Sequence, residues 1–444
     1  MEVLPGTAHR LLARAAEAQA HARLPSLVAG VVRDGALAWQ CGRGRVDGSP
    51  PTPDTQYRIG SITKTFTALA VMRLRDEGRL ALTDPLDAHV TGSPFGDRSI
   101  GQLLSHAGGV QAETAGPWWE RTPGGGWDET VGALDASAAP HAAGRRFHYS
   151  NLGFGLLGEV VARTRGRPWF DVLRDEILAP LGMRRTTYRP QPPHATGLAV
   201  HPWAEAVMVE PEHDHGLLAA AGQLWSTLED LARLAAFLLG DTGDVLSSAT
   251  LDEMAEPTQL ESAGGVSVSY GLGLETIEAD GSRLLGHNGA MPGFVASVFV
   301  DRDARFGTAH ASNITYGGDR GLTRGLAAIV RECEPPIPDE WRPADLPPGV
   351  ALDLLGPWYW GALPFALRAR ADGELELGPL EGEGRRSRFR LVGGEWIGVD
   401  GYFVGEPLRI APDGGSLDLV TFIFTRAPYA DGPIPGDVDP RGWT

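Results

Sequence analysis

Residues 57–66 of this chain read Tyr57-Arg58-Ile59-Gly60-Ser61-Ile62-Thr63-Lys64-Thr65-Phe66. The stretch contains Lys64, the only lysine among the 444 residues, and every other basic residue in the Lys+Arg total of 39 is an arginine. Arginine stays protonated in proteins, whereas a lysine amine loses its proton readily when it is desolvated. A lysine at this one position therefore favours a site that requires a neutral amine.

The spacing of Ser61 and Lys64 suggests what such an amine would do. Residues 62–77 show helical periodicity, and Gly78 follows as a helix-ending residue. Residues three apart on a helix share a face, so the two side chains can touch. A hydroxyl beside a desolvated amine is an activated nucleophile, and the start of a helix stabilises negative charge developing on its oxygen.

The composition is that of a globular protein, with 42% hydrophobic and 21% charged residues. The net charge of −17 argues against nucleic acid and anionic membrane surfaces as partners. Two cysteines, Cys41 and Cys333, are too few for a disulfide framework and lack metal-site spacing. We therefore expect neither a disulfide framework nor a cysteine metal site, and the serine chemistry inferred below needs no metal or other cofactor.

The opening residues and the hydropathy pattern bear on location. Residues 1–6 show neither the basic nor the apolar region of a secretory signal, and no run of 18 apolar residues suggests a membrane span. These observations predict a cytoplasmic protein.

Helix and strand patterns alternate over the first 333 residues. Asp34-Gly35 is a strong hairpin signal between two β-type runs. Strands are expected at 27–32, 36–41, 284–288, 294–300 and 306–312. Helices are expected at 7–22, 62–77, 99–105, 152–164, 170–179, 227–239, 247–255 and 321–333. We expect the opening hairpin and the three late strands to share one antiparallel sheet, flanked by the first and last helices.

Residues 190–225 are rich in proline and look irregular. They include the acidic and histidine-containing segment 210–215, which reads Glu-Pro-Glu-His-Asp-His. Its spacing fits no strong zinc template, so a solvated loop is predicted there.

A proline-rich linker at 334–349 divides the chain into a domain at 1–333 and a second domain at 350–444. The second domain shows short alternating runs, including 366–371, 388–392 and 417–424, separated by Asp-Gly and Gly-Gly turns. This pattern predicts a small all-β domain, either a lipocalin-like barrel or a sandwich.

Two later motifs carry residues that could complete a site with Ser61. In Tyr149-Ser150-Asn151, the phenol could relay a proton beside a neutral amine, and Asn151 could orient the amine and a substrate carbonyl. In His287-Asn288-Gly289-Ala290, Gly289 would allow close approach of a substrate, and the Ala290 N–H could donate to an oxyanion.

Taken in order, these motifs resemble those of the serine β-lactamase and penicillin-binding-protein superfamily, in particular class C β-lactamase-like hydrolases. The matches are Ser61-Ile62-Thr63-Lys64 to S-x-x-K, Tyr149-Ser150-Asn151 to Y-x-N, and His287-Asn288-Gly289 to the [KH]-x-G strand motif. The stretch Leu103 to Gly109 is also similar to one that these proteins carry between the first two motifs. The resemblance covers about residues 7–333.

The resemblance implies an α/β (α+β) fold with a β-lactamase/transpeptidase-like domain. Its antiparallel sheet is flanked by helices, an all-helical subdomain is added, and a small β-barrel-like domain follows. It also implies catalysis by Ser61, Lys64 and Tyr149. The oxyanion hole would be the backbone N–H groups of Ser61 and Ala290. Residues implied to bind substrate are Asn151, His287, Asn288 and Gly289.

The strand motif departs from that of β-lactamases proper, which carry Lys-Thr-Gly where this chain has His287-Asn288-Gly289. The His form resembles the family's esterases, D-aminopeptidases and peptide-cyclising thioesterases. We therefore expect a serine hydrolase acting on small esters or amides, including D-amino-acid peptides. An acyl-transferring thioesterase or cyclase, and an inactive binding or sensor protein on this fold, are the alternatives.

Overall fold

The computed structural model describes residues 2–428, except 136, 138, 264, 265, 280, 316–320 and 339. The chain forms two compact units, Met1–Pro336 and Ile337–Thr444. The boundary lies within the proline-rich segment 334–349.

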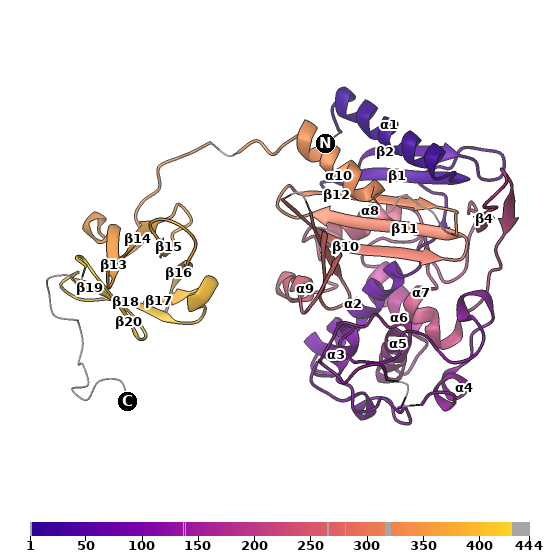
Figure 1. Cartoon of the computed structure of the whole chain (residues 1–444), viewed down its shortest axis with the longest axis horizontal. Coiled ribbons are helices and arrows are strands. Elements are labelled where there is room, and N and C mark those ends of the chain that lie inside the picture. Colours follow the sequence, from indigo (N-terminus) through magenta and orange to yellow (C-terminus); the bar gives the residue numbers. More distant parts are fainter. Residues whose placement is uncertain are drawn as a thin grey trace. The chain divides into compact units, whose positions relative to one another are not determined.

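The first unit is built on an eight-stranded antiparallel sheet (Figure 1). Its strand order is β2-β1-β12-β11-β10-β9-β8-β7. The strands are β1 (Ser26–Arg33), β2 (Ala36–Gly44), β7 (Gln259–Ala263), β8 (Val266–Tyr270), β9 (Glu275–Ala279), β10 (Ser282–Met291), β11 (Phe294–Asp301) and β12 (Phe306–Ser312). The predicted hairpin is confirmed, because Asp34 and Gly35 both adopt positive φ between β1 and β2.

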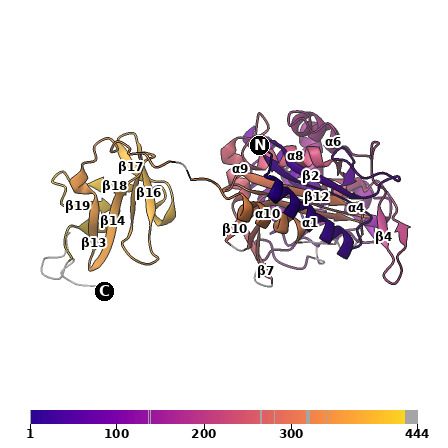
Figure 2. The same cartoon turned by 90° about the horizontal axis from the view of Figure 1, so that it is seen from above.

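Helices cover both faces of this sheet. α1 (Pro5–His21) and α10 (Leu322–Cys333) pack together over one face, as Figure 2 shows from above. α8 (Leu228–Leu238) packs on the opposite face against β1 and β12. Residues of β1 are buried along almost the whole strand, as expected for a strand covered on both sides.

A helical region extends from the α8 side of the sheet. It contains α2 (Ile62–Asp76), α3 (Ile100–Leu104), α4 (Trp127–Gly132), α5 (Asn151–Arg165), α6 (Trp169–Leu173), the π-helical turn η4 (Arg174–Leu178) and α7 (Ala219–Gly222). α9 (Ser248–Ala255) precedes β7. Two short ladders, β3 (Tyr57–Arg58) with β6 (Trp225–Ser226) and β4 (Leu198–Val200) with β5 (Val207–Val209), complete the unit.

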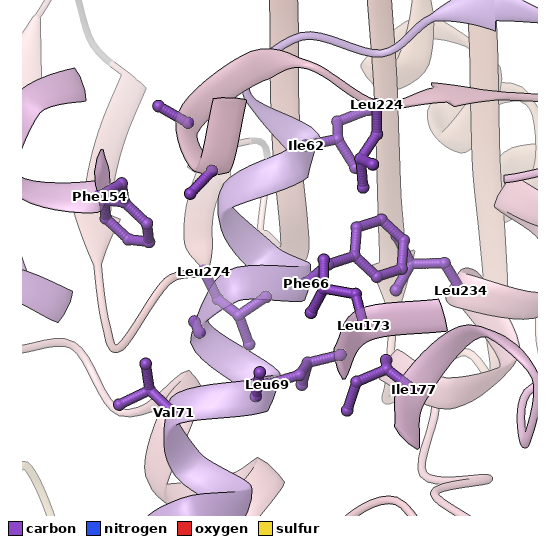
Figure 3. Close-up of a cluster of buried hydrophobic side chains, with 14 of the residues drawn as sticks. Ile62, Phe66, Leu69, Val71, Phe154, Leu173, Ile177, Leu224, Leu234 and Leu274 are labelled. Atoms are coloured by element: carbon purple, nitrogen blue, oxygen red, sulfur yellow. The ribbon is translucent and has the colours of Figure 1, made fainter. Parts of the chain in front are cut away.

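The helix α2 lies at the centre of this unit and is buried on nearly all sides. Phe66 and Leu69 project into a cluster that also contains Leu173 and Leu234 (Figure 3). Because its surroundings are apolar, the helix is fixed by packing rather than by surface contacts, and its first residues are held rigidly.

The second unit is a closed eight-stranded barrel. Of the two all-β folds predicted for it, a barrel or a sandwich, the structure has the barrel. Its strands are β13 (Gly356–Trp360), β14 (Leu363–Ala369), β15 (Leu375–Pro379), β16 (Ser387–Val392), β17 (Glu395–Gly398), β18 (Pro407–Ile410), β19 (Ser416–Leu419) and β20 (Phe422–Thr425). Trp358, Phe389 and Leu417 are fully buried in its interior.

The segment 210–215 is a loop, as predicted, and Pro211 and Glu212 are exposed, but the residues at its two ends are buried. Glu210 is buried and forms an ion pair with Arg121, and it also accepts a hydrogen bond from Thr315. His215 is buried beside the Arg58 guanidinium, and burial lowers its pKa to about 3. Long-range partners therefore neutralise polar groups that look like surface residues in the sequence.

No helix in the described part of the chain is long and apolar enough to cross a membrane.

Candidate active site

Ser61 and Lys64 lie one turn apart at the start of α2. Ser61 is the N-cap residue and is partly exposed, whereas Lys64 is fully buried. The Lys64 Nζ donates to Ser61 Oγ at 3.0 Å and to the Ala221 carbonyl oxygen at 2.8 Å. Burial lowers the pKa of Lys64 to about 7, although the nearby carboxylates of Glu113 and Glu275 act in the opposite direction. A substantial fraction of Lys64 is thus neutral at neutral pH.

Tyr149 lies beside Lys64 and Ser61. Its phenol is close enough to the Ser61 side chain to interact with it, and its ring centroid lies 4.8 Å from Lys64 Nζ. Burial raises the pKa of Tyr149, so the phenol stays protonated at neutral pH. The three side chains predicted to be catalytic are therefore brought together in the structure.

The backbone of β10 passes directly against the turn that leads into α2. A Cβ at Gly289 would lie 1.9 Å from the Ile59 carbonyl oxygen and 3.2 Å from the Ser61 nitrogen. A Cβ at Gly60 would lie 2.6 Å from the Ala290 nitrogen. Glycine at both positions lets the Ser61 and Ala290 backbones approach closely, which is the arrangement that two oxyanion-hole donors require.

Along the strand motif in β10, exposed and buried residues alternate. Asn288 and Ala290 are exposed, whereas His287 is 1% exposed. The His287 Nε2 is 3.1 Å from the Tyr270 hydroxyl, and its Nδ1 lies 2.5 Å from the Asn288 carbonyl oxygen. Burial lowers the pKa of His287, so the ring is neutral. His287 is thus buried, with its ring against the Tyr270 hydroxyl and the Asn288 carbonyl oxygen, and its role in substrate binding stays a prediction.

Asn151 is the first residue of α5, and its side chain contacts the carboxylate of Glu113, which no sequence motif indicated. Its Nδ2 donates to Glu113 Oε1 at 2.8 Å, and Trp119 Nε1 donates to Glu113 Oε2 at 2.5 Å. Glu275 similarly accepts from Asn288 Nδ2 at 2.9 Å. The side-chain amides of Asn151 and Asn288, both predicted to bind substrate, therefore each donate a hydrogen bond to a glutamate.

A buried histidine, His106, packs against the Tyr149 motif and against Tyr270. His106 has φ of +56°, and its Nδ1 accepts from the Ser150 N–H at 3.0 Å. Its ring packs against Tyr149 with centroids 4.2 Å apart and a 32° angle between the rings, and against Tyr270 with centroids 4.6 Å apart and a 56° angle. Because Nδ1 accepts, the neutral ring carries its hydrogen on Nε2, which has no partner among the described residues. Burial lowers the pKa of His106 well below its ordinary value.

A pocket of about 340 Å³ opens beside Tyr149. It is lined by Phe147, His148, Tyr149, Val268, Ser269, Tyr270 and Glu275. Its size is that of a small-molecule site. No group of three or more metal-ligating side chains gathers in the part of the chain that the structure describes.

Four residues of this site were not assigned a role from the sequence: Glu113, His106, Tyr270 and Glu275. His106 stood in the stretch 103–109 that prompted the family resemblance, which was the one available signal. The two glutamates and Tyr270 come from segments without a motif, and only the fold brings them to Ser61.

The comparisons with known proteins agree with this geometry. The beta-lactamase family matches residues 12–332, and a domain of unknown function, DUF7586, matches residues 347–426. "Beta-lactamase-like protein 2" of Dictyostelium discoideum is 26% identical over 334 residues, which is 69% of this chain and 59% of that protein. The chain thus spans less than two thirds of that relative.

Solved structures share the fold. A D-stereospecific amidohydrolase from Streptomyces sp. is 27% identical with a TM-score of 0.62, covering 73% of this chain and 98% of that one. An octameric penicillin-binding protein homologue from Pyrococcus abyssi is 22% identical with a TM-score of 0.66, covering 94% and 99%. With a family match across most of the first unit and the Ser61, Lys64 and Tyr149 constellation at its centre, this chain belongs to the beta-lactamase family.

Proposed function

We propose that this protein is a serine hydrolase that acts on small esters or amides through a covalent acyl-enzyme. The observation that carries the proposal is the buried Lys64 amine, 3.0 Å from the Ser61 hydroxyl, with a pKa lowered to about 7. A neutral amine at that distance can accept the serine proton, which a permanently charged group could not do.

In the proposed reaction, Ser61 Oγ attacks the substrate carbonyl carbon, and its proton passes to Lys64 Nζ. The carbonyl oxygen becomes an oxyanion that accepts hydrogen bonds from the N–H groups of Ser61 and Ala290. Tyr149, which is protonated at neutral pH, donates to the leaving group and regains its proton from the Lys64 ammonium. Water then attacks the acyl-enzyme ester and releases the acid and Ser61.

The charges around the nucleophile favour a substrate that carries an amine. The carboxylates of Glu113, Glu275 and Glu120 all act on Lys64. Such a field attracts a cationic group and repels an anion. The likeness to a D-stereospecific amidohydrolase supports amino-acid amides, including D-amino-acid derivatives, as the class to test.

The same field disfavours β-lactams, whose carboxylate is an anion. The strand position at which β-lactamases proper carry lysine is His287 here, and this ring is neutral and buried. It supplies no positive charge for a substrate carboxylate. We therefore infer that β-lactams are poor substrates.

A panel of matched substrates tests this proposal. The panel contains D- and L-phenylalanine p-nitroanilide, the N-acetylated form of each, and a chromogenic cephalosporin. We expect the free-amine anilide of the preferred configuration to exceed its N-acetylated form in kcat/KM by about tenfold or more, as for loss of one charged contact. Glu113→Gln should shrink that ratio, and Ser61→Ala should abolish every activity.

Two results would contradict the proposal. If the cephalosporin is the best substrate in a Ser61-dependent reaction, the assignment of substrate class is wrong. If no member of the panel acylates a folded protein, the alternative of an inactive binding protein gains support.

A further inference from the structure

The barrel unit has a pocket that the hydrolytic reaction does not use. In a closed antiparallel barrel the β13–β14, β15–β16, β17–β18 and β19–β20 connections all lie at the same end. A pocket of about 380 Å³ at this end is lined by residues of the β15–β16 and β17–β18 connections and by strand residues near the other two connections. The barrel interior below is filled by side chains such as Trp358 and Phe389, both fully buried. The pocket is therefore a recess at the barrel mouth, and its volume is that of a small-molecule site.

The walls of this recess are largely apolar and partly open to water. Phe365 and Phe424 are buried and form part of its lining. Trp360 and Leu363 also line it, yet they are 39% and 56% exposed. Large apolar side chains gathered around a hollow, rather than scattered singly, mark a surface that binds a ligand.

One cation lies among these rings. The Arg385 guanidinium carbon is 4.3 Å from the ring centroid of Tyr402, 4.8 Å from that of Phe422 and 5.7 Å from that of Trp360. Arg385 is exposed, and a guanidinium that lies near aromatic rings can keep the N–H donors in its plane for another partner.

Within the described residues, those donors have no carboxylate or other hydrogen-bond acceptor. Neighbouring arginines differ in this respect: Arg386 donates to Glu376 at 3.0 Å, and Arg390 donates to Glu374 at 2.7 Å. Arg385 stays unpaired although Glu381 and Glu383 line the same recess. A guanidinium held by aromatic rings with its fork unused is ready to bind a planar anion in bidentate fashion.

We propose that the barrel mouth binds a small monocarboxylate with an apolar body. The body would lie against Trp360, Leu363 and Phe365, and the carboxylate would accept two hydrogen bonds from Arg385. The carboxylates of Glu381 and Glu383, which line the same recess, repel a second negative charge on the ligand. They therefore disfavour ligands with more than one carboxylate. This site is separate from the Ser61 chemistry and does not depend on it.

Three probes with the same body and different head groups test the proposal on the full chain: 4-phenylbutyrate, 4-phenylbutyramide and 4-phenylbutylamine. Binding is followed by saturation-transfer NMR and isothermal titration. We expect 4-phenylbutyrate to bind with a Kd on the order of 1 mM or tighter, because a small ligand gains little beyond one charged contact and one apolar face. The amide and the amine should bind about tenfold more weakly or worse.

Variants locate the site. Arg385→Gln should weaken 4-phenylbutyrate binding by about tenfold or more and leave the amide unaffected. The combined change Glu381→Gln and Glu383→Gln should strengthen binding of the acid, because it removes opposing charge. Arg409→Gln, at an exposed arginine of β18 outside the recess, is the matched control and should change nothing. Melting curves check that each variant is folded.

The proposal is overturned if 4-phenylbutylamine binds more tightly than 4-phenylbutyrate, since the rings would then serve as a cage for an external cation. It is also overturned if Arg385→Gln and Arg409→Gln bind the acid equally well, or if the native chain binds none of the three probes. Leu363→Asn gives a second check: it should weaken the acid and the amide alike.

Discussion

The side-chain nitrogen of Lys64 lies 3.0 Å from the side-chain oxygen of Ser61. Both residues are at the start of α2, a helix that is buried on nearly all sides. This relationship links the fold to the chemistry. The packing that fixes α2 also removes water from Lys64, and that loss of solvation lowers the pKa of its amine. The same burial places the amine where it can take the proton of a nucleophile.

The first prediction concerns the identity of the base. Lys64→Arg keeps a positive charge but cannot present a neutral nitrogen, because the pKa of arginine is above about 12. It should lower the rate of Ser61 acylation by about 10²–10⁴-fold, the usual contribution of a general base. Stopped-flow acylation with p-nitrophenyl acetate measures this rate. Lys64→Ala provides the comparison, and melting curves report folding. A folded arginine variant within a factor of a few of the native rate would exclude Lys64 as the base.

The second prediction concerns pH. The active form of Lys64 is neutral, and its pKa is lowered to about 7 from an ordinary value of 10.5. The acylation rate should therefore rise as pH increases through about 7 and level off above it. Single-turnover rates from pH 5 to 9, a range of about two units on each side, would define the curve. A rate that shows no plateau and is still rising steeply at pH 9 would mean that Lys64 is charged in the resting protein.

The third prediction concerns the close approach of two backbones. A methyl group at position 289 would lie 1.9 Å from the Ile59 carbonyl oxygen, so Gly289→Ala must push β10 away from the start of α2. Separation of the two oxyanion donors should lower kcat by about 10²–10³-fold. Steady-state kinetics and melting curves would measure it. Gly6→Ala is the control, because no atom lies within 4 Å of its added carbon. Normal kcat in Gly289→Ala would place the oxyanion elsewhere.

The fourth prediction assigns His106 a positioning role toward Tyr149. The rings pack together with centroids 4.2 Å apart, and His106 accepts the N–H of Ser150, the residue after Tyr149. His106→Ala should misplace the phenol and slow anilides, whose leaving group needs a proton. It should affect p-nitrophenyl esters much less, because their leaving group departs as an anion. The ratio of the two kcat values therefore distinguishes positioning from general damage.

His106→Asn is the conservative variant for this test. Asparagine tolerates the positive φ of +56° and can still accept from the Ser150 N–H, but it lacks the ring. It should restore stability relative to His106→Ala while retaining the anilide defect. Equal losses on anilide and ester in both variants would indicate a purely structural role.

The sequence revealed the parts of the site that depend on local pattern. The helix carrying Ser61 and Lys64 has strong periodicity, and the hairpin at Asp34 and Gly35 has an explicit turn signal. Both are present with nearly the predicted bounds. The barrel was anticipated from its turns, as one of two alternatives.

Features that depend on tertiary contacts were missed. The strands β7, β8 and β9 were not predicted, and Tyr270 and Glu275 belong to that part of the sheet. The run 417–424 was predicted as one strand, but it is the β19–β20 hairpin and turns at Val420, which has φ of +63° and carries no turn signal. His287 is buried with its ring against Tyr270 of β8, and no local sequence pattern predicts that contact.

The most direct test of this account is intact-mass measurement after reaction with a fluorophosphonate, followed by peptide mapping. We predict one adduct per chain, on the peptide that contains Ser61, and none in a folded Ser61→Ala variant. Equal labelling of that variant, or an adduct on another residue in the native protein, would contradict the claim that Ser61 is the nucleophile.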